Sequence, residues 1–501
     1  MTETPRRNTA TLQTLFILAL FAAGLAVRLI GFRNPPGDIE GWRQFASACI
    51  ARGMYYDMLP DADPDRQQQA AYLAATFGVQ EPRVFERVVA LTNLIFHTEL
   101  LWLARAWAIA FWLTGCLFFF LLVRRALGFP AAALALLYPL FLPYAVAYSR
   151  TFLPDVLMVA LLMVGFWSAH RWIEQPCWRR ALLAGVVLGL AILIKVFAVF
   201  FVGFGLAGML LAERGLRRSL AERQVWLVAG LALLIPALYY LVPRADFTPG
   251  GYFQTFVLPF TSRLLDWEFY LQWRNRLTLF NLGLVVVSLL FTFLLPKALR
   301  GLTLGLWGGY LVYGMVLAGP IYHKYYSLSV VFIVALGLAG LAGHLYDVLR
   351  QQKLVWRLAL AAALLFVIAD SSFQARKQLR SPDLSGEPAF WAELSADLPD
   401  GRYIGVAEDY NTRMQYYGWR FIAFYSYPGE ADLSTPEADP ERFNSQDVAY
   451  FLTRVEGSDY FIATTPIDRV TKNILYYHYP LVRSGERYWV FDLDNPTQPP
   501  E

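Results

Sequence analysis

Two carboxylates, Asp38 and Glu40, lie a few residues after the first long apolar run of the chain, Leu12 to Ile30. Ionisable groups beside a membrane-length segment are costly to keep unless they face water or a site. A carboxylate held in such a place can take a proton from an attacking hydroxyl group. This segment is therefore the first candidate for chemistry.

A further carboxylate, Asp155, follows Pro154 at the start of another apolar run, and Lys195 interrupts a later one. The remaining candidates are cationic or aromatic side chains near predicted helix ends: Arg105, His323, Lys324 and Tyr325. Cations can stabilise the negative charge that develops on a phosphate leaving group. Carboxylates and cations at one membrane face would therefore suit the transfer of a group from an anionic lipid.

Several of these residues also have a plain structural explanation. Asp38 could cap a following helix, and Glu40 would then lie in its first turn, where negative charge is favoured. An aspartate directly after a proline, such as Asp155, is ordinary chemistry for a helix start. Lys195 and Arg105 could simply extend their charged ends to the membrane interface.

The composition is that of a membrane protein. The 501 residues are 57% hydrophobic and 16% charged, whereas soluble domains are roughly 45–50% apolar and about 25% charged. The net charge of +4 is too small to indicate nucleic acid as a partner. The three cysteines, Cys49, Cys116 and Cys177, lack metal-ligand spacing, so the sequence predicts neither a disulfide nor a metal cluster.

The apolar runs predict about eleven membrane-spanning helices. They lie near residues 11–31, 99–123, 130–148, 153–171, 181–195, 197–213, 225–242, 278–297, 302–318, 327–348 and 355–370. Arginine clusters, which mark the cytoplasmic side, stand on both sides of the stretch 181–213. Both clusters are inside only if the chain crosses twice there, which predicts an outward hairpin tip at Lys195. Eleven crossings put the N-terminus inside and the C-terminus outside.

The first outer loop, residues 32–98, is predicted to carry interfacial helices. One has an apolar face of Trp42, Phe45, Ala46, Cys49 and Ile50, opposite a polar face of Arg43, Gln44 and Ser47. A second covers Glu86 to Phe96, and the polar segment from Asp61 to Arg66 begins another helix between them. Such helices lie along a membrane surface.

After Asp370 the composition changes to that of a small α/β domain. We expect a membrane domain over 1–370, which includes the first loop, and a soluble outer domain over 371–501. Strands are predicted at 403–407, 421–425 and 460–464, helices at 410–417 and 445–455, and a closing hairpin at 481–482 and 488–492.

The order of these motifs resembles the GT-C membrane glycosyltransferases, in the branch of the protein O-mannosyltransferases and lipid A aminoarabinose transferases. The resemblance covers about residues 1–370. The segments that carry it are Gly37 to Glu40, Ala104-Arg105, Tyr148 to Asp155, Gly189 to Lys195 and His323 to Tyr326.

This resemblance implies the transfer of a sugar from a polyprenyl-phosphate donor to a hydroxyl of a lipid, glycan or protein, with inversion. Asp38 matches the catalytic base and Asp155 the second acidic position, while Lys195 and His323 match places near the donor phosphate. The family often has adjacent acids, but Ile39 separates them here, and His97-Thr98-Glu99 stands where it often has His-Pro-Pro. A divalent metal could take part, although no ligands for one are identified.

The same resemblance implies an integral protein of a bacterial inner membrane with its site and C-terminal domain on the periplasmic face. Two other functions stay open: transport or flipping of a lipid-linked sugar, and a non-catalytic membrane scaffold. A transporter would be expected to carry polar groups near the middle of the bilayer, whereas the ionisable candidates here gather at one face.

Overall fold

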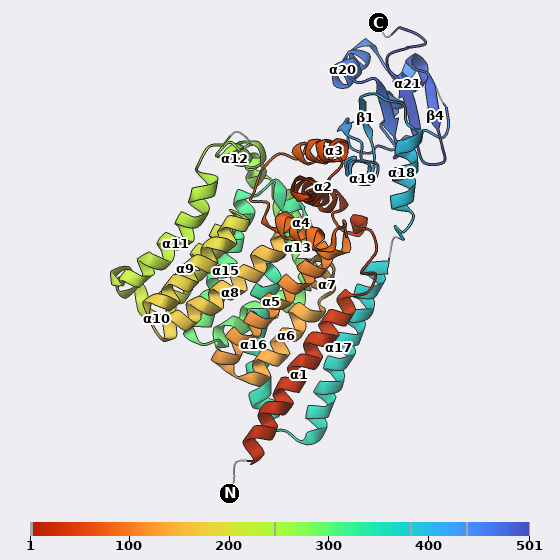
Figure 1. Cartoon of the computed structure of the whole chain (residues 1–501). Coiled ribbons are helices and arrows are strands. Elements are labelled where there is room, and N and C mark those ends of the chain that lie inside the picture. The colour runs from red at the N-terminus through yellow and green to blue at the C-terminus, as the bar shows by residue number, and fades with distance from the viewer. Residues whose placement is uncertain (1–3, 245–246, 381–382, 437–438, 500–501) are drawn as a thin grey trace. The chain divides into compact units, whose positions relative to one another are not determined.

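The computed structural model describes residues 4–244, 247–380, 383–436 and 439–499 (Figure 1). The chain forms two compact units. The first, here called the helical unit, contains Met1–Phe32, Gly78–Phe85 and Trp102–Ser381. The second, the sheet unit, contains Arg33–Phe77, Glu86–Leu101 and Pro382–Glu501. Most of the first loop therefore belongs to the same unit as the C-terminal segment.

The helical unit consists of long apolar helices joined by short links. They are α1 (Thr4–Arg28), α5 (Trp102–Leu127), α6 (Phe129–Phe141), α7 (Pro143–Tyr148), α8 (Pro154–Glu174), α9 (Trp178–Ile194), α10 (Ala198–Ala221), α11 (Arg223–Tyr240), α12 (Gly251–Phe256), α13 (Trp267–Arg276), α14 (Leu282–Phe291), α15 (Lys297–Val316), α16 (Val330–Leu349) and α17 (Leu354–Arg380). The predicted interruption at Lys195 is confirmed, because α9 ends at Ile194 and α10 begins at Ala198.

Seven helices of the described chain are long and apolar enough to cross a membrane. The number rises to eight if Trp267–Phe280 and Leu282–Leu294, which meet at 85°, form one span. Large apolar side chains on α1, α11, α14 and α17 are exposed, as expected for surfaces that face lipid. The chain is an integral membrane protein, and the count of eleven crossings stays a prediction.

Glycines allow α10 and α15 to pack closely. A Cβ on Gly301 of α15 would lie 2.1 Å from the carbonyl oxygen of Gly208 on α10, and one on Gly305 would lie 2.2 Å from that of Phe204. Small residues spaced four apart let helix backbones approach one another in a membrane. This packing supports α10, which begins three residues after Lys195.

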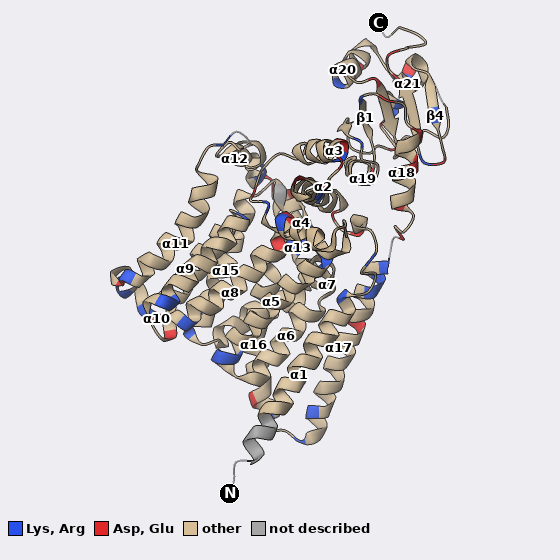
Figure 2. Cartoon of the chain, in the orientation of Figure 1, with Lys and Arg blue, Asp and Glu red and all other residues tan. Residues whose placement is uncertain are grey.

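The basic clusters of several helices lie together at one end of the helical unit. Arg125 at the end of α5 pairs with Glu174 at the end of α8. Arg214 of α10 donates to the carbonyl of Ile173, 3.3 Å away. Figure 2 shows blue ribbon segments, which mark Lys and Arg, near the junction of α10 and α11, while the middles of the helices are mostly tan. Asp155 lies at the opposite end of α8, roughly 30 Å away along a helix of this length.

The sheet unit contains a five-stranded sheet with the order β2-β1-β3-β5-β4. Its strands are β1 (Tyr403–Val406), β2 (Ile422–Phe424), β3 (Tyr460–Ala463), β4 (Leu481–Ser484) and β5 (Trp489–Asp492). Strand β1 runs parallel to β2 and β3, and β5 runs antiparallel to β3 and β4. The predicted strands and the closing hairpin are confirmed.

The helices of this unit come from both parts of the chain. They are α2 (Gly41–Met58), α3 (Pro64–Ala75), the larger part of α4 (Val84–Phe96), α18 (Glu387–Asp397), α19 (Thr412–Tyr417), α20 (Ser445–Val455) and α21 (Arg469–His478). Helices α18 and α21 were not predicted. The sequence does predict the loop helices α2, α3 and α4 and the C-terminal helices α19 and α20.

Two details predicted for the start of α2 are wrong. Asp38 ends a short 3-10 turn, Pro36–Asp38, and the residue that precedes the helix is Glu40, in a left-handed conformation with φ of 48° and no side-chain cap. The polar face predicted for α2 is also partly buried. Gln44 donates to the carbonyls of Pro36 and Ile39, and Ser47 donates to Glu86, so both polar groups have partners inside the protein.

Candidate active site

Asp155 and Lys195 form a buried ion pair. The ammonium nitrogen of Lys195 lies 2.8 and 2.7 Å from the two carboxylate oxygens of Asp155. Only 2% of Asp155 and 5% of Lys195 is exposed. The lysine therefore does not extend to the surface, and the interpretation of Lys195 as an interfacial lysine is wrong.

Helix ends bring this pair together. Pro154 and Asp155 form the first turn of α8, and Lys195 directly follows the last residue of α9. The two helices pack side by side. A carboxylate is favoured at a helix N-terminus and a cation at a C-terminus, because each opposes the partial charge of the helix dipole. Both charges thus lie where their helices stabilise them.

Tyrosine rings enclose the cationic side of the pair. The Lys195 ammonium lies 4.4 Å from the ring centre of Tyr326 and 5.0 Å from that of Tyr325. The Tyr326 hydroxyl forms a 2.9 Å hydrogen bond with the hydroxyl of Tyr252. The Tyr313 hydroxyl donates to the backbone carbonyl of Tyr326 over 2.8 Å. The rings are therefore held against the lysine, and cation–π attraction adds to the ion pair.

The structure places the other residues of this link differently. His323 stacks on Tyr325, with ring centres 5.5 Å apart. Lys324 is exposed, and its backbone carbonyl accepts a hydrogen bond from the Tyr144 hydroxyl over 2.6 Å. Of the predicted residues in the helical unit, the structure thus brings Asp155, Lys195, Tyr325 and His323 together, and Lys324 borders this group.

Arg105 holds the backbone that follows α1. Its guanidinium donates to the carbonyls of Gly31 and Phe32, each at 3.1 Å, and the side chain is buried. Arg150 also donates to the Gly31 carbonyl, at 2.8 Å. Arg28, at the end of α1, donates to Ser149 over 2.7 Å. These arginines tie the end of α1 to the segment that leads into Asp155.

The tie from Arg28 and Arg150 was not predicted from the sequence. A signal for it was present, because arginines at the ends of apolar runs need partners when they are buried. The partners are mostly backbone carbonyls, which a sequence pattern does not reveal.

A cavity of about 880 Å³ lies in the helical unit, and Lys324 is one of its lining residues. Its walls are mostly apolar, with leucine side chains from α6, α14, α16 and α17, among them Leu134, Leu284, Leu341 and Leu364. Polar side chains also line it, including Tyr144, Tyr148 and Lys324. A largely apolar space with a few polar groups suits a molecule with a long hydrocarbon part and a polar head.

Asp38 and Glu40 belong to the sheet unit, where both side chains are partly buried. Asp38 ends the turn Pro36–Asp38, whose backbone is held by the Gln44 amide through the Pro36 carbonyl at 2.8 Å. The Ile39 carbonyl accepts from the same amide at 2.7 Å. The segment that carries Asp38 is therefore fixed on both sides of the carboxylate.

No group of three or more His, Cys, Asp or Glu side chains in the described ranges is arranged to hold a metal ion.

Comparisons with known proteins agree on one kind of fold. Residues 80–240 match the model of a family described as dolichyl-phosphate-mannose-protein mannosyltransferase. This segment includes both Asp155 and Lys195, whereas Asp38 and Tyr325 lie outside it. No match was found among curated proteins compared by sequence.

Three solved structures share the architecture. ArnT from Cupriavidus metallidurans in the apo state has 15% identity, with 95% of this chain and 98% of that chain covered, and a TM-score of 0.58. The same protein bound to undecaprenyl phosphate has 16% identity, with 95% of this chain and 98% of that chain covered, and a TM-score of 0.54. The apo oligosaccharyltransferase of Archaeoglobus fulgidus has 14% identity, with 93% of this chain and 73% of that chain covered, and a TM-score of 0.52.

Proposed function

We propose that this chain, a GT-C glycosyltransferase of the protein-mannosyltransferase and ArnT type, moves a sugar from a polyprenyl-phosphate donor to an acceptor hydroxyl. The observation that carries the proposal is the buried pair of Asp155 and Lys195. It lies inside the segment that matches the mannosyltransferase family. A buried cation can hold the phosphate of a lipid-linked donor.

Lys195 is the proposed partner of the donor phosphate. An ammonium group has three N–H donors, and the bonds to Asp155 use two of them. The third can point to a phosphate oxygen, where the positive charge stabilises the leaving group as the bond to the sugar breaks. Asp155 fixes the direction of the ammonium, and Tyr325 and Tyr326 exclude water from it.

Asp38 is the proposed base. The acceptor hydroxyl loses its proton to the Asp38 carboxylate as its oxygen attacks C1 of the sugar. The bond between C1 and the phosphate oxygen breaks, polyprenyl phosphate leaves, and the configuration at C1 inverts. The support is that the segment that carries Asp38 is held in place by Gln44, through the carbonyls of Pro36 and Ile39.

The cavity of the helical unit is the proposed place for hydrocarbon of a lipid substrate. Its leucine walls fit an isoprenoid or acyl chain, and Lys324 lies both in its wall and next to Tyr325 in the sequence. The solved ArnT structure that holds undecaprenyl phosphate supports a polyprenyl-phosphate donor for a chain of the same fold.

The proposed reaction takes place at the periplasmic face of a bacterial inner membrane. The support is the common position of the basic clusters at one end of α8, opposite Asp155. Under the positive-inside rule this end is cytoplasmic. The N-terminus would then be inside and the sheet unit outside.

The direct test is incubation of the purified chain with a panel of polyprenyl-phosphate sugars and with lipid, glycan and peptide acceptors, followed by mass analysis. Release of polyprenyl phosphate with one donor of the panel supports the proposal, and the accompanying product identifies the acceptor class. A transporter or a scaffold would leave every donor intact.

A further inference from the structure

The segment that carries Asp38 packs against a strained loop of the C-terminal domain within the sheet unit. This loop, Asp409 to Asn411, follows β1 at the carboxyl end of the parallel strands. All three residues have positive φ angles of 54°, 55° and 68°. Such angles cost about 1–3 kcal/mol for a non-glycine residue and persist only where the surroundings impose them.

The Asn411 side chain imposes the conformation. It is fully buried, accepts from the backbone amide of Ala407 over 2.8 Å, and donates to the carbonyl of Ala423 over 3.1 Å. The amide thus connects β1 and β2 beneath the loop. The loop cannot relax without breaking these bonds, so its side chains have a fixed position.

Asp409 lies directly against the start of α2. A Cβ added to Gly41 would lie 2.4 Å from a carboxylate oxygen of Asp409, a distance that side chains do not tolerate. The backbone amide of Trp42 donates to the same carboxylate. The Trp42 ring also contacts that of Tyr410, with centres 5.6 Å apart. The residues that follow Asp38 are therefore docked on this loop.

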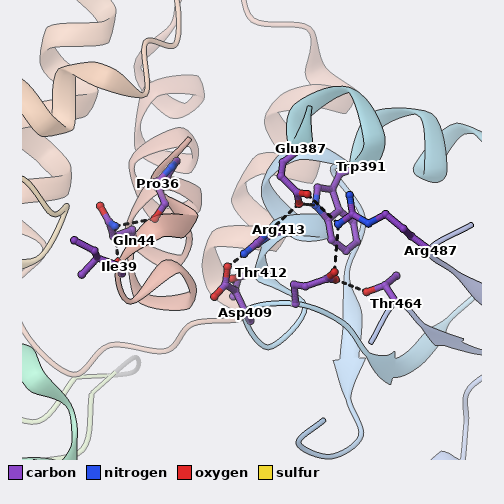
Figure 3. Close-up of polar contacts among 11 residues, drawn as sticks. Pro36, Ile39, Gln44, Glu387, Trp391, Asp409, Thr412, Arg413, Thr464 and Arg487 are labelled. Atoms are coloured by element: carbon purple, nitrogen blue, oxygen red, sulfur yellow. Dashed lines mark hydrogen bonds and ion pairs between the residues drawn. The ribbon is translucent and has the colours of Figure 1, made fainter. Parts of the chain in front are cut away.

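Arg413 supports the other side of the same segment. Its guanidinium donates to Asp409 over 2.6 Å and to Glu387 over 2.8 Å. A Cβ added to Gly37 would lie 3.1 Å from this guanidinium. Figure 3 shows Arg413 between Glu387 and Asp409, with Arg487 reaching Glu387 from the opposite side. The two glycines that flank Asp38 thus each face one member of a single charged network.

We propose that Asp409 and Arg413 are positioning residues that hold the Asp38 carboxylate in its working place. The proposal rests on the assignment of Asp38 as base. It gives the C-terminal domain a direct part in transfer, because the domain sets the backbone on both sides of the proposed base. Gly41 is required in this arrangement because a Cβ there would collide with the Asp409 carboxylate, and Gly37 leaves the room that the Arg413 guanidinium occupies.

The test uses the full chain with Gly41→Ala, whose added methyl group collides with Asp409. A displacement of the base by about 1 Å lowers kcat on the order of 10²-fold. We expect this loss in kcat, per folded enzyme, with the KM for the polyprenyl-phosphate donor unchanged. The matched control is Gly386→Ala, in the same unit, where an added Cβ meets no atom within 4 Å; it should keep wild-type kcat.

Arg413→Lys gives a second, independent variant, since lysine keeps the charge but cannot reach both Asp409 and Glu387. It should lower kcat in the same way. In an Asp409→Gly background, Gly41→Ala should cause no additional loss, because the collision is gone. Wild-type kcat in both Gly41→Ala and Arg413→Lys would overturn the positioning role.

The proposed function and this inference fail in different ways. If Asp38→Asn retains full activity, Asp38 is not the base. If Asp38→Asn is inactive while Gly41→Ala and Arg413→Lys are fully active, the base assignment stands and the positioning role is wrong.

Discussion

The ammonium of Lys195 lies between the two carboxylate oxygens of Asp155, at 2.8 and 2.7 Å, and both side chains are buried. Removal of one member leaves a buried charge without its partner, which costs about 3–5 kcal/mol. Lys195→Met should therefore lower both the unfolding temperature and the rate of transfer.

The double variant Asp155→Leu with Lys195→Met separates these two effects. Replacement of both members of a buried pair by apolar residues is often neutral for stability. The unfolding temperature should recover toward the wild-type value while transfer stays lost, because the phosphate has no cation. Recovery of transfer along with stability would show that the pair is only structural.

The cavity should control the apparent affinity for the lipid substrate. Leu341 lines it, so Leu341→Trp fills part of the 880 Å³. A loss confined to binding raises KM and leaves kcat unchanged, and we expect this pattern for the polyprenyl-phosphate donor. Leu290→Trp is the control, because Leu290 is 63% exposed on α14 and does not line the cavity. Equal KM values for the two variants would argue against the cavity as a lipid site.

The orientation in the membrane can be measured with the native cysteines. Cys177 is exposed between α8 and α9, whereas Cys49 and Cys116 are buried. In intact cells Cys177 should resist a membrane-impermeant maleimide, because the basic end of the helical unit is predicted to be cytoplasmic. A Cys177→Ser chain with Glu456→Cys, an exposed position of the sheet unit, should react. The reverse pattern of labelling would invert the topology.

Acid should weaken the sheet unit through Glu387. Burial alone would raise the pKa of Glu387, but hydrogen bonds from Arg413, Trp391 and Arg487 lower it below the ordinary value of 4.5. A carboxylate with a lowered pKa stabilises the fold above its unfolded pKa, and this stability is lost as the pH falls through the folded pKa. The unfolding temperature should therefore fall below about pH 4.5.

Glu387→Gln isolates this contribution. It should lower the unfolding temperature at pH 7, because hydrogen bonds to a charged group are worth about 1.5–3 kcal/mol. Below about pH 4.5 the unfolding temperature of this variant should change less with pH than that of the wild type. Glu393→Gln, an exposed change on the same helix, should behave like wild type. Burial raises the pKa of Asp409, so the contribution of Asp409 to stability changes with pH in the opposite direction. A wild-type unfolding temperature that does not change with pH would therefore contradict a dominant role for Glu387.

Features set by local pattern could be predicted, and features set by distant partners could not. The break at Lys195 follows from the arginine clusters on both sides, and α9 and α10 confirm it. The bond from Lys195 to Asp155 spans 40 residues and depends on how α8 packs against α9, which no run of residues reveals. Gln44 and Ser47 lie on the predicted polar face of α2, but their periodic spacing does not show the buried partners they have.

The proposed base illustrates the same limit. The position of Asp38 after the first apolar run makes it a candidate base, while the alternative interpretation of Asp38 as the cap of α2 is wrong because Glu40 precedes that helix. Its surroundings depend on Asp409 and Arg413, more than 350 residues later. The left-handed loop that contains Asp409 has no glycine, so the sequence does not indicate its conformation.

The central claim is that Asp38 accepts the proton of the acceptor hydroxyl. Its most direct test is the rate of transfer by purified Asp38→Asn with the donor that the wild-type chain consumes, with Glu40→Gln as the neighbouring control. Loss of a positioned base costs about 10²–10⁴-fold. We predict a kcat reduced by this factor with an unchanged unfolding temperature, and a clearly smaller loss for Glu40→Gln. Wild-type kcat in Asp38→Asn would contradict the claim.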